Sequence, residues 1–368
     1  MAINKENRID RRAAIKTAVT ISSGIGASIL SRQTIANEKE KNQNIQSKGE
    51  AFSPIEGSNP LNAKIITFTT ISKDVDKSIE FYRDVIGMTV FEDKYLPKHV
   101  SSIDGIGHSD RRHVLLTMPE SPRSAAVRIL EASPSASPIR PRPESGPMDP
   151  GLLVMEGSTK DPAMSYHTLK SAKVPMISPP RYYYFRNTMW KRDIDVMSYS
   201  PFGPGGEQLF LTANIRSDRP ERDFPGLHGG FSNAAITSLD QRPVNDFFEK
   251  TLGLKRTSQM ECYQKNTNEL IGAPEETYFL WGNLASGVSI EVWEVKASSG
   301  VIYPCALDKT GLAMLTIRVD DLSKCREMCY KSGIKPIAEG ALPNQVNKRP
   351  NGFMLRGAVG EIFEIVQS

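Results

Sequence analysis

The sequence has 368 residues, of which 39% are hydrophobic and 24% are charged, and its formal net charge is +4 at pH 7. Six of its 46 basic residues but only two of its 42 acidic residues lie in residues 1–36, which leaves 40 of each in the remaining chain. This neutral remainder has no basic run interleaved with aromatic residues, so we exclude nucleic acid as a partner. About 300 residues are enough for two domains with sizeable cores.

Residues 1–36 resemble a twin-arginine export signal. Arg11 and Arg12 precede a weakly apolar run, residues 17–30, and a small-residue cleavage site ends at Ala36. The run is too short, and too rich in Ser and Gly, to form a stable membrane span. We expect export to the bacterial periplasm by the twin-arginine machinery, with cleavage near Ala36. A frayed basic N-terminus is the alternative.

Residues 37–60 are polar, charged and poor in apolar side chains, which is the composition of a flexible linker. The following stretch, residues 64–93, predicts a strand, a short helix and a second strand. Asp74 or Asp76 can cap the helix, whose apolar positions recur every three or four residues. Gly87 then ends the helix, because glycine adopts a left-handed conformation at least cost.

The chain repeats this unit. Residues 230–256 reproduce the helix and its glycine stop, so that Gly253 follows Gly87 by 166 residues. A second unit, residues 169–176, recurs 161 residues later at 330–337. Repetition at a fixed spacing is stronger evidence than any single motif. The chain therefore contains four modules, which we call A (61–132), B (151–213), A′ (230–295) and B′ (311–368).

The opening Asp74–Met88, together with its repeat, resembles the vicinal oxygen chelate superfamily of glyoxalases, bleomycin-resistance proteins and extradiol dioxygenases. The resemblance covers roughly residues 63–368. It implies an α+β fold in which four βαβββ modules pair into two cupped, mixed β-sheet domains. We expect module A to pair with B and module A′ with B′, so the first domain spans residues 61–213, the second spans 230–368, and 214–229 is the linker.

In the superfamily, four inward strand positions of a module pair hold a divalent metal, usually Zn, Mn, Fe or Ni. Carried over by position, the first pair offers Thr67, Arg128, Met155 and Phe210, and the second offers Asn233, Glu291, Met314 and Glu364. The first set cannot bind a divalent cation, and its arginine is expected to meet a substrate carboxylate.

The second pair is the expected active domain. Glu291 and Glu364 alternate with apolar neighbours, so both should point inward. They are the candidate catalytic residues, either as metal ligands together with Asn233 or as a general base. The expected substrate-binding residues are Arg128, Asn233, Met314, Trp293 and His228.

The resemblance thus implies an exported lyase or isomerase that acts on a small oxygenated organic molecule. A non-catalytic small-molecule binder of the bleomycin-resistance type is the alternative. A ring-cleaving dioxygenase is disfavoured, because Asn233 and Met314 replace the expected histidines. The sequence leaves open the substrate, the presence of a metal, and whether modules pair within one chain or across a homodimer.

The chain has only four cysteines, so we expect the core rather than disulfides to hold the exported protein together. Cys325 and Cys329 lie four residues apart on a predicted helix, which favours a packed core face. A bridge between Cys262 and Cys305 is the alternative use of the other two.

Overall fold

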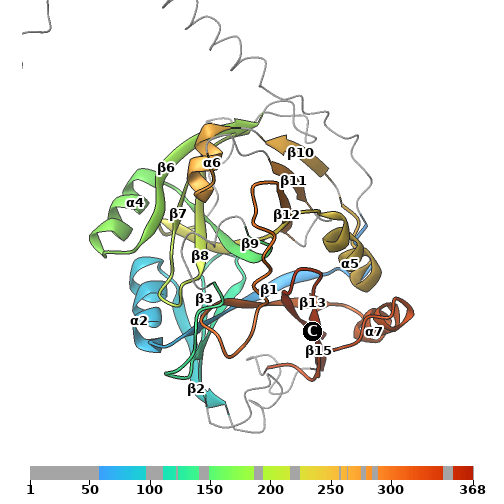
Figure 1. Ribbon diagram of the computed structural model, residues 1–368. Helices are drawn as coiled ribbons and strands as arrows, with labels where there is room; N and C mark the ends of the chain where they lie inside the picture. The colour runs from blue at the N-terminus through green and yellow to red at the C-terminus, as the bar shows by residue number, and fades with distance from the viewer. Residues whose placement is uncertain are drawn as a thin grey trace, which may run out of the picture. The chain divides into compact units, whose positions relative to one another are not determined.

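Two eight-stranded sheets make up the computed structural model: sheet A combines modules A and B′, which are far apart in the sequence, and sheet B combines the neighbouring modules B and A′ (Figure 1). Sheet A has the strand order β14 (Ala338–Glu339), β15 (Gly352–Arg356), β16 (Ile362–Gln367), β13 (Gly311–Val319), β1 (Lys64–Ser72), β4 (Ala126–Glu131), β3 (Arg111–Thr117) and β2 (Thr89–Leu96). Sheet B has the order β10 (Ser258–Cys262), β11 (Phe279–Asn283), β12 (Ile290–Val295), β9 (His228–Ser238), β5 (Gly151–Thr159), β8 (Gln208–Asn214), β7 (Ile194–Pro201) and β6 (Met176–Phe185).

The helices are α2 (Val75–Glu80), which continues into the π-helical turn η1 (Phe81–Val85), α4 (Pro162–Ser171), α5 (Arg242–Leu252), α6 (Lys265–Ile271) and α7 (Leu322–Lys331). The structure describes residues 58–96, 111–121, 123–140, 149–185, 194–215, 224–256, 258–262, 264–274, 279–283, 289–342 and 351–367. The expected export signal and most of the expected linker lie outside these residues. The described residues all belong to one compact unit, Ser47–Ser368.

The α+β fold of four βαβββ modules in two cupped sheets is confirmed, but the expected pairing of module A with B and of module A′ with B′ is wrong. Strand β1 of module A pairs antiparallel with β13 of module B′, and β5 of module B pairs antiparallel with β9 of module A′. Each first strand can satisfy its backbone groups against the first strand of either repeat, so the repeat pattern does not select the partner. Both sheets are completed within one chain.

Local signals in module A are realised as predicted. The Asp74 side chain accepts a hydrogen bond from the Lys77 backbone N–H at 2.9 Å, so Asp74 rather than Asp76 caps the first helix. Gly87 has a φ of 91°, and Gly253 ends α5 with a φ of 68°. Both glycines stand where a side chain would be strained.

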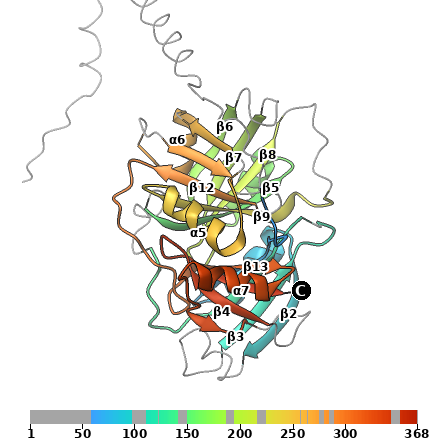
Figure 2. The same cartoon turned by 90° about the vertical axis from the view of Figure 1, so that its right-hand side faces the viewer.

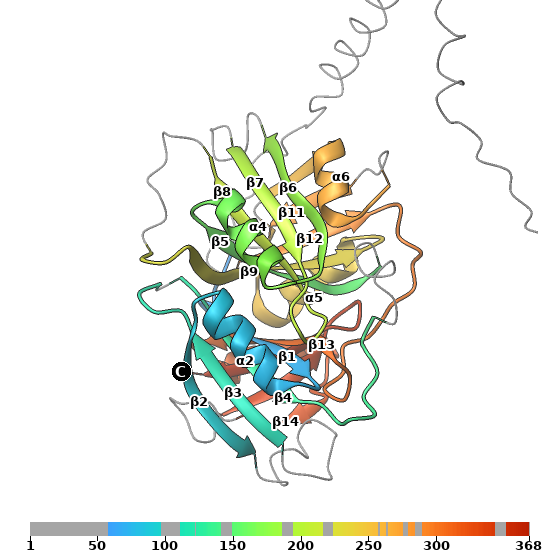
Figure 3. The same cartoon turned by 90° about the vertical axis from the view of Figure 1, so that its left-hand side faces the viewer.

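The two sheets pack back to back around one shared hydrophobic core. The rings of Phe68 in β1 and Phe231 in β9 meet edge to face, with centroids 6.5 Å apart. The Tyr82 hydroxyl donates to Glu207 Oε1 at 2.5 Å and so ties module A to module B. Helices α5 and α7 lie side by side (Figure 2), and α2 and α4 do so on the other side (Figure 3). Module A′ therefore contacts module B′ through its helix, although the two modules lie in different sheets.

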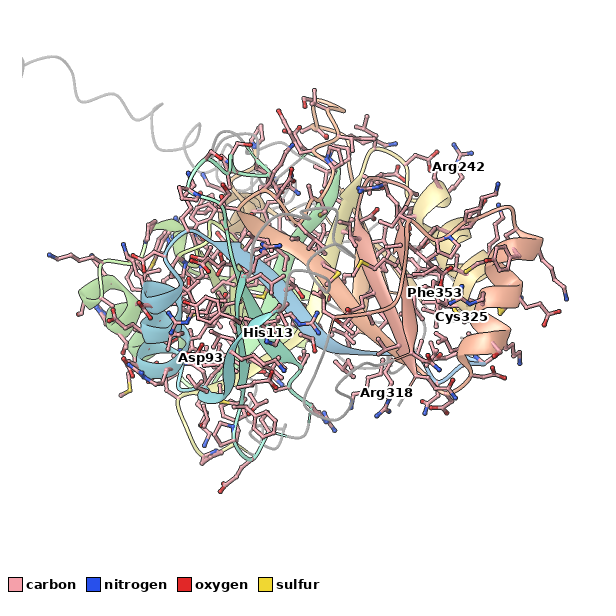
Figure 4. The ribbon with its side chains drawn as sticks, turned by 90° about the horizontal axis from the view of Figure 1, so that it is seen from below. Asp93, His113, Arg242, Arg318, Cys325 and Phe353 are labelled. Atoms are coloured by element: carbon pink, nitrogen blue, oxygen red, sulfur yellow. The ribbon has the colours of Figure 1, made fainter. Side chains whose placement is uncertain are left out.

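Cys325 and Cys329 are buried free thiols, so the predicted core face of α7 is confirmed. The helix meets sheet A near Cys325 and Phe353 (Figure 4), where the Arg326 guanidinium stacks 4.5 Å from the Phe353 ring. Cys305 is also a buried free thiol, so the alternative bridge to Cys262 is wrong. Within the described residues, every helix is too short or too polar to cross a membrane.

Candidate functional site

Each sheet carries a group of polar side chains on its outer face, which is turned away from the other sheet. In sheet A, Val127 and Ile129 enter the shared core, so the residue between them, Arg128, faces outward. We call the outward group of sheet A cup A: Thr67, Thr69, His113, Arg128, Thr316 and Glu364. We call the corresponding group of sheet B cup B: Glu156, Phe210, Thr212, Asn233, Glu291 and Trp293.

The expected association of Glu291 with Glu364 is wrong, because the first lies in cup B and the second in cup A. The expected metal-binding trio, which combined both with Asn233, therefore does not form. Glu364 instead joins Arg128, which the sequence had placed in the other pair. The swapped pairing of the modules explains both differences.

The first-strand positions of modules B and B′ also differ from expectation. Glu156, not Met155, pairs in register with Asn233 on the outer face of sheet B, and Met155 is buried in the shared core. Thr316 takes the corresponding position of sheet A, where it pairs in register with Thr67. Met314 is buried and pairs with Thr69, two residues away from the expected place.

A buried ion pair dominates cup A. Arg128 Nη1 lies 3.0 Å from Glu364 Oε2, and neither side chain is exposed. The Thr316 hydroxyl donates to the same oxygen at 2.6 Å, and the Leu342 backbone N–H donates to Glu364 Oε1 at 2.5 Å. Both oxygens of this carboxylate are therefore engaged, as a buried charge requires.

His113 belongs to the same cup. Its strand pairs with β4 so that His113 lies opposite Leu130 and Leu115 lies opposite Arg128, which puts His113 on the face that carries the arginine. Burial, followed by the positive charges of Arg128 and Lys94, lowers the pKa of His113 to about 3. The imidazole is therefore neutral at physiological pH.

Two carboxylates lie in cup B. Glu156 Oε1 accepts a hydrogen bond from the Thr212 hydroxyl at 3.1 Å, and its Oε2 accepts one from Asn233 Nδ2 at 3.2 Å. Glu291 lies on β12, the strand next to β9. It is buried and accepts a hydrogen bond from Trp293 Nε1 at 3.0 Å. These donors fix both carboxylates on one face of the sheet.

An aromatic wall stands beside these carboxylates. The Phe210 and Trp293 rings have centroids 5.5 Å apart, and both belong to a second hydrophobic cluster that also contains Tyr183. A flat organic molecule can stack on such a surface while its oxygen atoms meet the polar groups.

The expected place of His228 at the rim of the active cup is wrong. His228 is buried at the start of β9, with Nδ1 3.2 Å from the Ile86 carbonyl and Nε2 2.5 Å from Ser165 Oγ. Burial lowers its pKa to about 4, so the neutral ring donates to Ile86 and accepts from Ser165, which in turn contacts the Tyr199 hydroxyl. This chain of hydrogen bonds links modules A, B and A′.

A cavity of about 1070 Å³ lies between module A and module B, away from both cups. It is lined mainly by apolar side chains, with Arg140 and Glu207 among its polar residues. Arg140 donates to the carbonyls of Asp149 and Leu152, and Glu207 accepts from Tyr82, so both serve the packing of this region.

Comparison with known proteins supports this architecture. Residues 64–208 match the family described as the Glyoxalase/Bleomycin resistance protein/Dioxygenase superfamily. These residues form a domain of that superfamily. Glyoxalase I from Zea mays has the same fold, with a TM-score of 0.54 at 14% identity over 83% of this chain and 92% of its own.

A putative dioxygenase from Bacillus subtilis subsp. subtilis str. 168 is also similar, with a TM-score of 0.51 at 13% identity over 83% of this chain and 84% of its own. At such identities the likeness shows the fold alone. Among curated proteins, none matches the chain significantly.

Cup A does not fit the divalent metal that glyoxalase-superfamily members commonly bind. The Arg128 guanidinium occupies one of the four strand positions at which the superfamily carries metal ligands. It pairs with Glu364, which is the one carboxylate among those four positions. A second cation beside it would be repelled, and threonine hydroxyls are weak ligands.

Cup B has a donor set that fits a hard, oxygen-preferring cation such as Mg²⁺ or Mn²⁺, because Glu156, Glu291 and Asn233 offer carboxylate and amide oxygens. The four metal-ligand positions of cup B are Glu156, Phe210, Asn233 and Glu291, and they include no imidazole or thiolate, the ligands that Zn prefers. No group of three or more His, Cys, Asp or Glu residues with metal-binding geometry occurs in the described part of the chain.

Two residues of the cups, Glu156 and His113, were not predicted from the sequence as site residues. Strand β5 is buried on both faces, so its residues lack the polar alternation that would have singled out Glu156. His113 lies inside β3, but the two arginines before it are more typical of an exposed turn than of a buried strand position. If modules B and A′ had been taken as partners, the register that pairs Asn233 with Glu156 would have identified Glu156.

The two buried histidines should make the protein acid-sensitive. Both pKa values are lowered from 6.5, so the unfolded chain binds protons first, and the unfolding free energy should fall as the pH drops from about 6.5 towards 4. His228 should contribute on the order of 3 kcal/mol to this loss. Urea unfolding at a series of pH values measures the slope.

The His228→Gln variant should show a shallower slope than the parent over this pH range. His167→Gln is the matched control, because His167 is exposed on α4 and should leave the slope unchanged. An unchanged slope in His228→Gln would contradict the assignment of a neutral, buried ring.

Proposed function

We propose that this chain is an enzyme of the lyase or isomerase type that acts on a small oxygenated organic molecule in cup B. The observation that carries the proposal is the presence of two oriented carboxylates, Glu156 and Glu291, on one sheet face beside an aromatic wall. This revises the pair of catalytic residues expected from the sequence, in which Glu364 stood in place of Glu156.

The chemistry follows from the positions of the two carboxylates. One carboxylate removes a proton from the carbon next to a carbonyl group, and the resulting acid returns the proton at another atom of the substrate or to a departing oxygen. The first outcome is an isomerisation and the second is a lyase reaction. Trp293 and Asn233 orient the carboxylates through their N–H donors.

A divalent metal held by Glu156, Glu291 and Asn233 would supply Lewis-acid polarisation of the substrate oxygens. The aromatic wall of Phe210 and Trp293 would orient the substrate in either case. A ring-cleaving oxygenase is less well supported, because the metal-ligand positions of cup B carry Glu, Asn and Phe where imidazole ligands would be needed.

Non-catalytic binding of a small molecule is the second candidate. It is favoured by cup A, where an ion pair neutralises itself and a metal does not fit. The two candidates differ in what Glu291→Gln should do, because a binder keeps its affinity when a carboxylate becomes an amide of the same shape.

The enzyme proposal predicts proton exchange that depends on cup B. In D₂O, a panel of hydroxyketones and dicarbonyl compounds followed by NMR should reveal a compound whose α-protons exchange in the presence of the protein. Glu291→Gln and Glu156→Gln should each lower this rate by about 10²–10⁴, the usual contribution of a positioned acid or base.

Glu294→Gln is the matched control, because Glu294 lies on the same strand with its side chain bonded to Gln241 N–H and directed away from cup B. Exchange that survives in Glu291→Gln and Glu156→Gln would contradict the proposal. Elemental analysis of the same samples decides the metal, since bound Mn or Mg should be lost in both variants and kept in Glu294→Gln.

We further propose that residues 1–36 direct twin-arginine export to a bacterial periplasm. The support is the Arg11-Arg12 pair, the apolar run after it and the small residues up to Ala36. In a bacterial host, the periplasmic protein should begin at about residue 37, as measured by mass spectrometry of the intact chain. Replacement of both arginines by lysine should retain the full-length chain in the cytoplasm, and periplasmic recovery of that variant would refute the proposal.

A further inference from the structure

The Arg128 guanidinium has an unused edge. Its Nη1 atom donates to Glu364, whereas Nε and Nη2 have no hydrogen-bond partner among the residues that the structure describes. Arg128 is the largest of the fully buried side chains, with an exposed fraction of 0%. Unpaired donors of a buried cation are costly, so a group other than the residues that the structure describes should meet them.

The geometry of that edge is informative. Nε and Nη2 lie side by side in the guanidinium plane, and their N–H groups form the fork that binds the two oxygens of a carboxylate. Within cup A, Glu364 cannot fill this fork, because its oxygens already accept from Arg128 Nη1, Thr316 and Leu342.

His113 adds a second unsatisfied group on the same face. Both of its ring nitrogens are buried and lack a hydrogen-bond partner within the described chain, and the nearest carboxylate oxygen, of Glu92, is 3.7 Å away and is paired with Lys94. A neutral imidazole offers one donor and one acceptor, which suits a hydroxyl or carbonyl group rather than a second charge.

We propose that cup A is a metal-free binding site for a small organic monocarboxylate, which Arg128 holds through its Nε–Nη2 edge and which His113 contacts through a neighbouring polar group. The negative charge of Glu364, 3.0 Å from the guanidinium, selects against a dianion such as phosphate. This site is separate from cup B and does not depend on the function proposed there.

Formate is the appropriate probe, because the smallest carboxylate depends least on the shape of the natural ligand. In the full mature chain, the Arg128 Nε–H resonance should shift saturably when formate is added, and the Arg128→Lys spectrum assigns that resonance. Formamide, which has the same shape without the charge, and inorganic phosphate should cause no saturable shift.

Arg128→Lys keeps the charge but loses the fork, so in calorimetric titrations, which need no arginine resonance, it should bind formate at least about tenfold more weakly than the parent. Arg112→Gln is the matched control. Arg112 neighbours His113 but points outward to Asp93 and Asp76, and its loss should leave formate binding unchanged. Equal affinity in parent and Arg128→Lys would overturn the proposal.

A second measurement needs no variant and therefore survives a failure of Arg128→Lys to fold. At constant ionic strength, formate should raise the thermal unfolding midpoint of the parent, whereas chloride, formamide and phosphate should not. An equal effect of formate and chloride, together with an unshifted arginine resonance, would overturn the proposal and assign the edge to ordered water.

Discussion

Backbone pairing between first strands is the constraint on which this structure depends. The N–H and C=O groups at the open edge of β1 must be satisfied, and β13 supplies their partners; β9 does the same for β5. This choice decides which side chains meet. It brings Arg128 to Glu364 and gathers Glu156, Asn233 and Glu291 around a separate cup. A different choice of partners would have produced two other sites from the same four modules.

The two cups have diverged in opposite directions. Cup A has a buried cation at a metal-ligand position, and its carboxylate is fully engaged with that cation and with two further donors. Cup B keeps oxygen ligands on three strands and has an aromatic wall. A repeated domain can separate roles in this way, because each cup is completed by its own pair of modules. Cup A then discriminates by charge, whereas cup B carries the groups that can move protons.

Local structure was predictable from the sequence, and long-range pairing was not. The cap at Asp74, the glycine stops at Gly87 and Gly253 and the position of Glu291 on the cup face of its strand all depend on neighbours in the sequence, and the structure has them as predicted. The partner of each module depends on contacts between residues that lie from 69 (Thr159 and His228) to 254 (Lys64 and Arg318) positions apart, for which similar repeats give no preference. Strands β5 and β13 are buried on both faces, so their sequences do not alternate in polarity and do not indicate which residue faces the cup.

The most direct test of this account is a crosslink between the first strands of modules A and B′. Lys64 and Arg318 are register partners in β1 and β13, so the Lys64→Cys/Arg318→Cys protein should form a disulfide on mild oxidation, identified by peptide mass spectrometry. Ser158 is the counterpart of Arg318 in module B, and Lys64→Cys/Ser158→Cys should not crosslink. A disulfide in the second protein and none in the first would contradict the module pairing, and with it the composition of both cups.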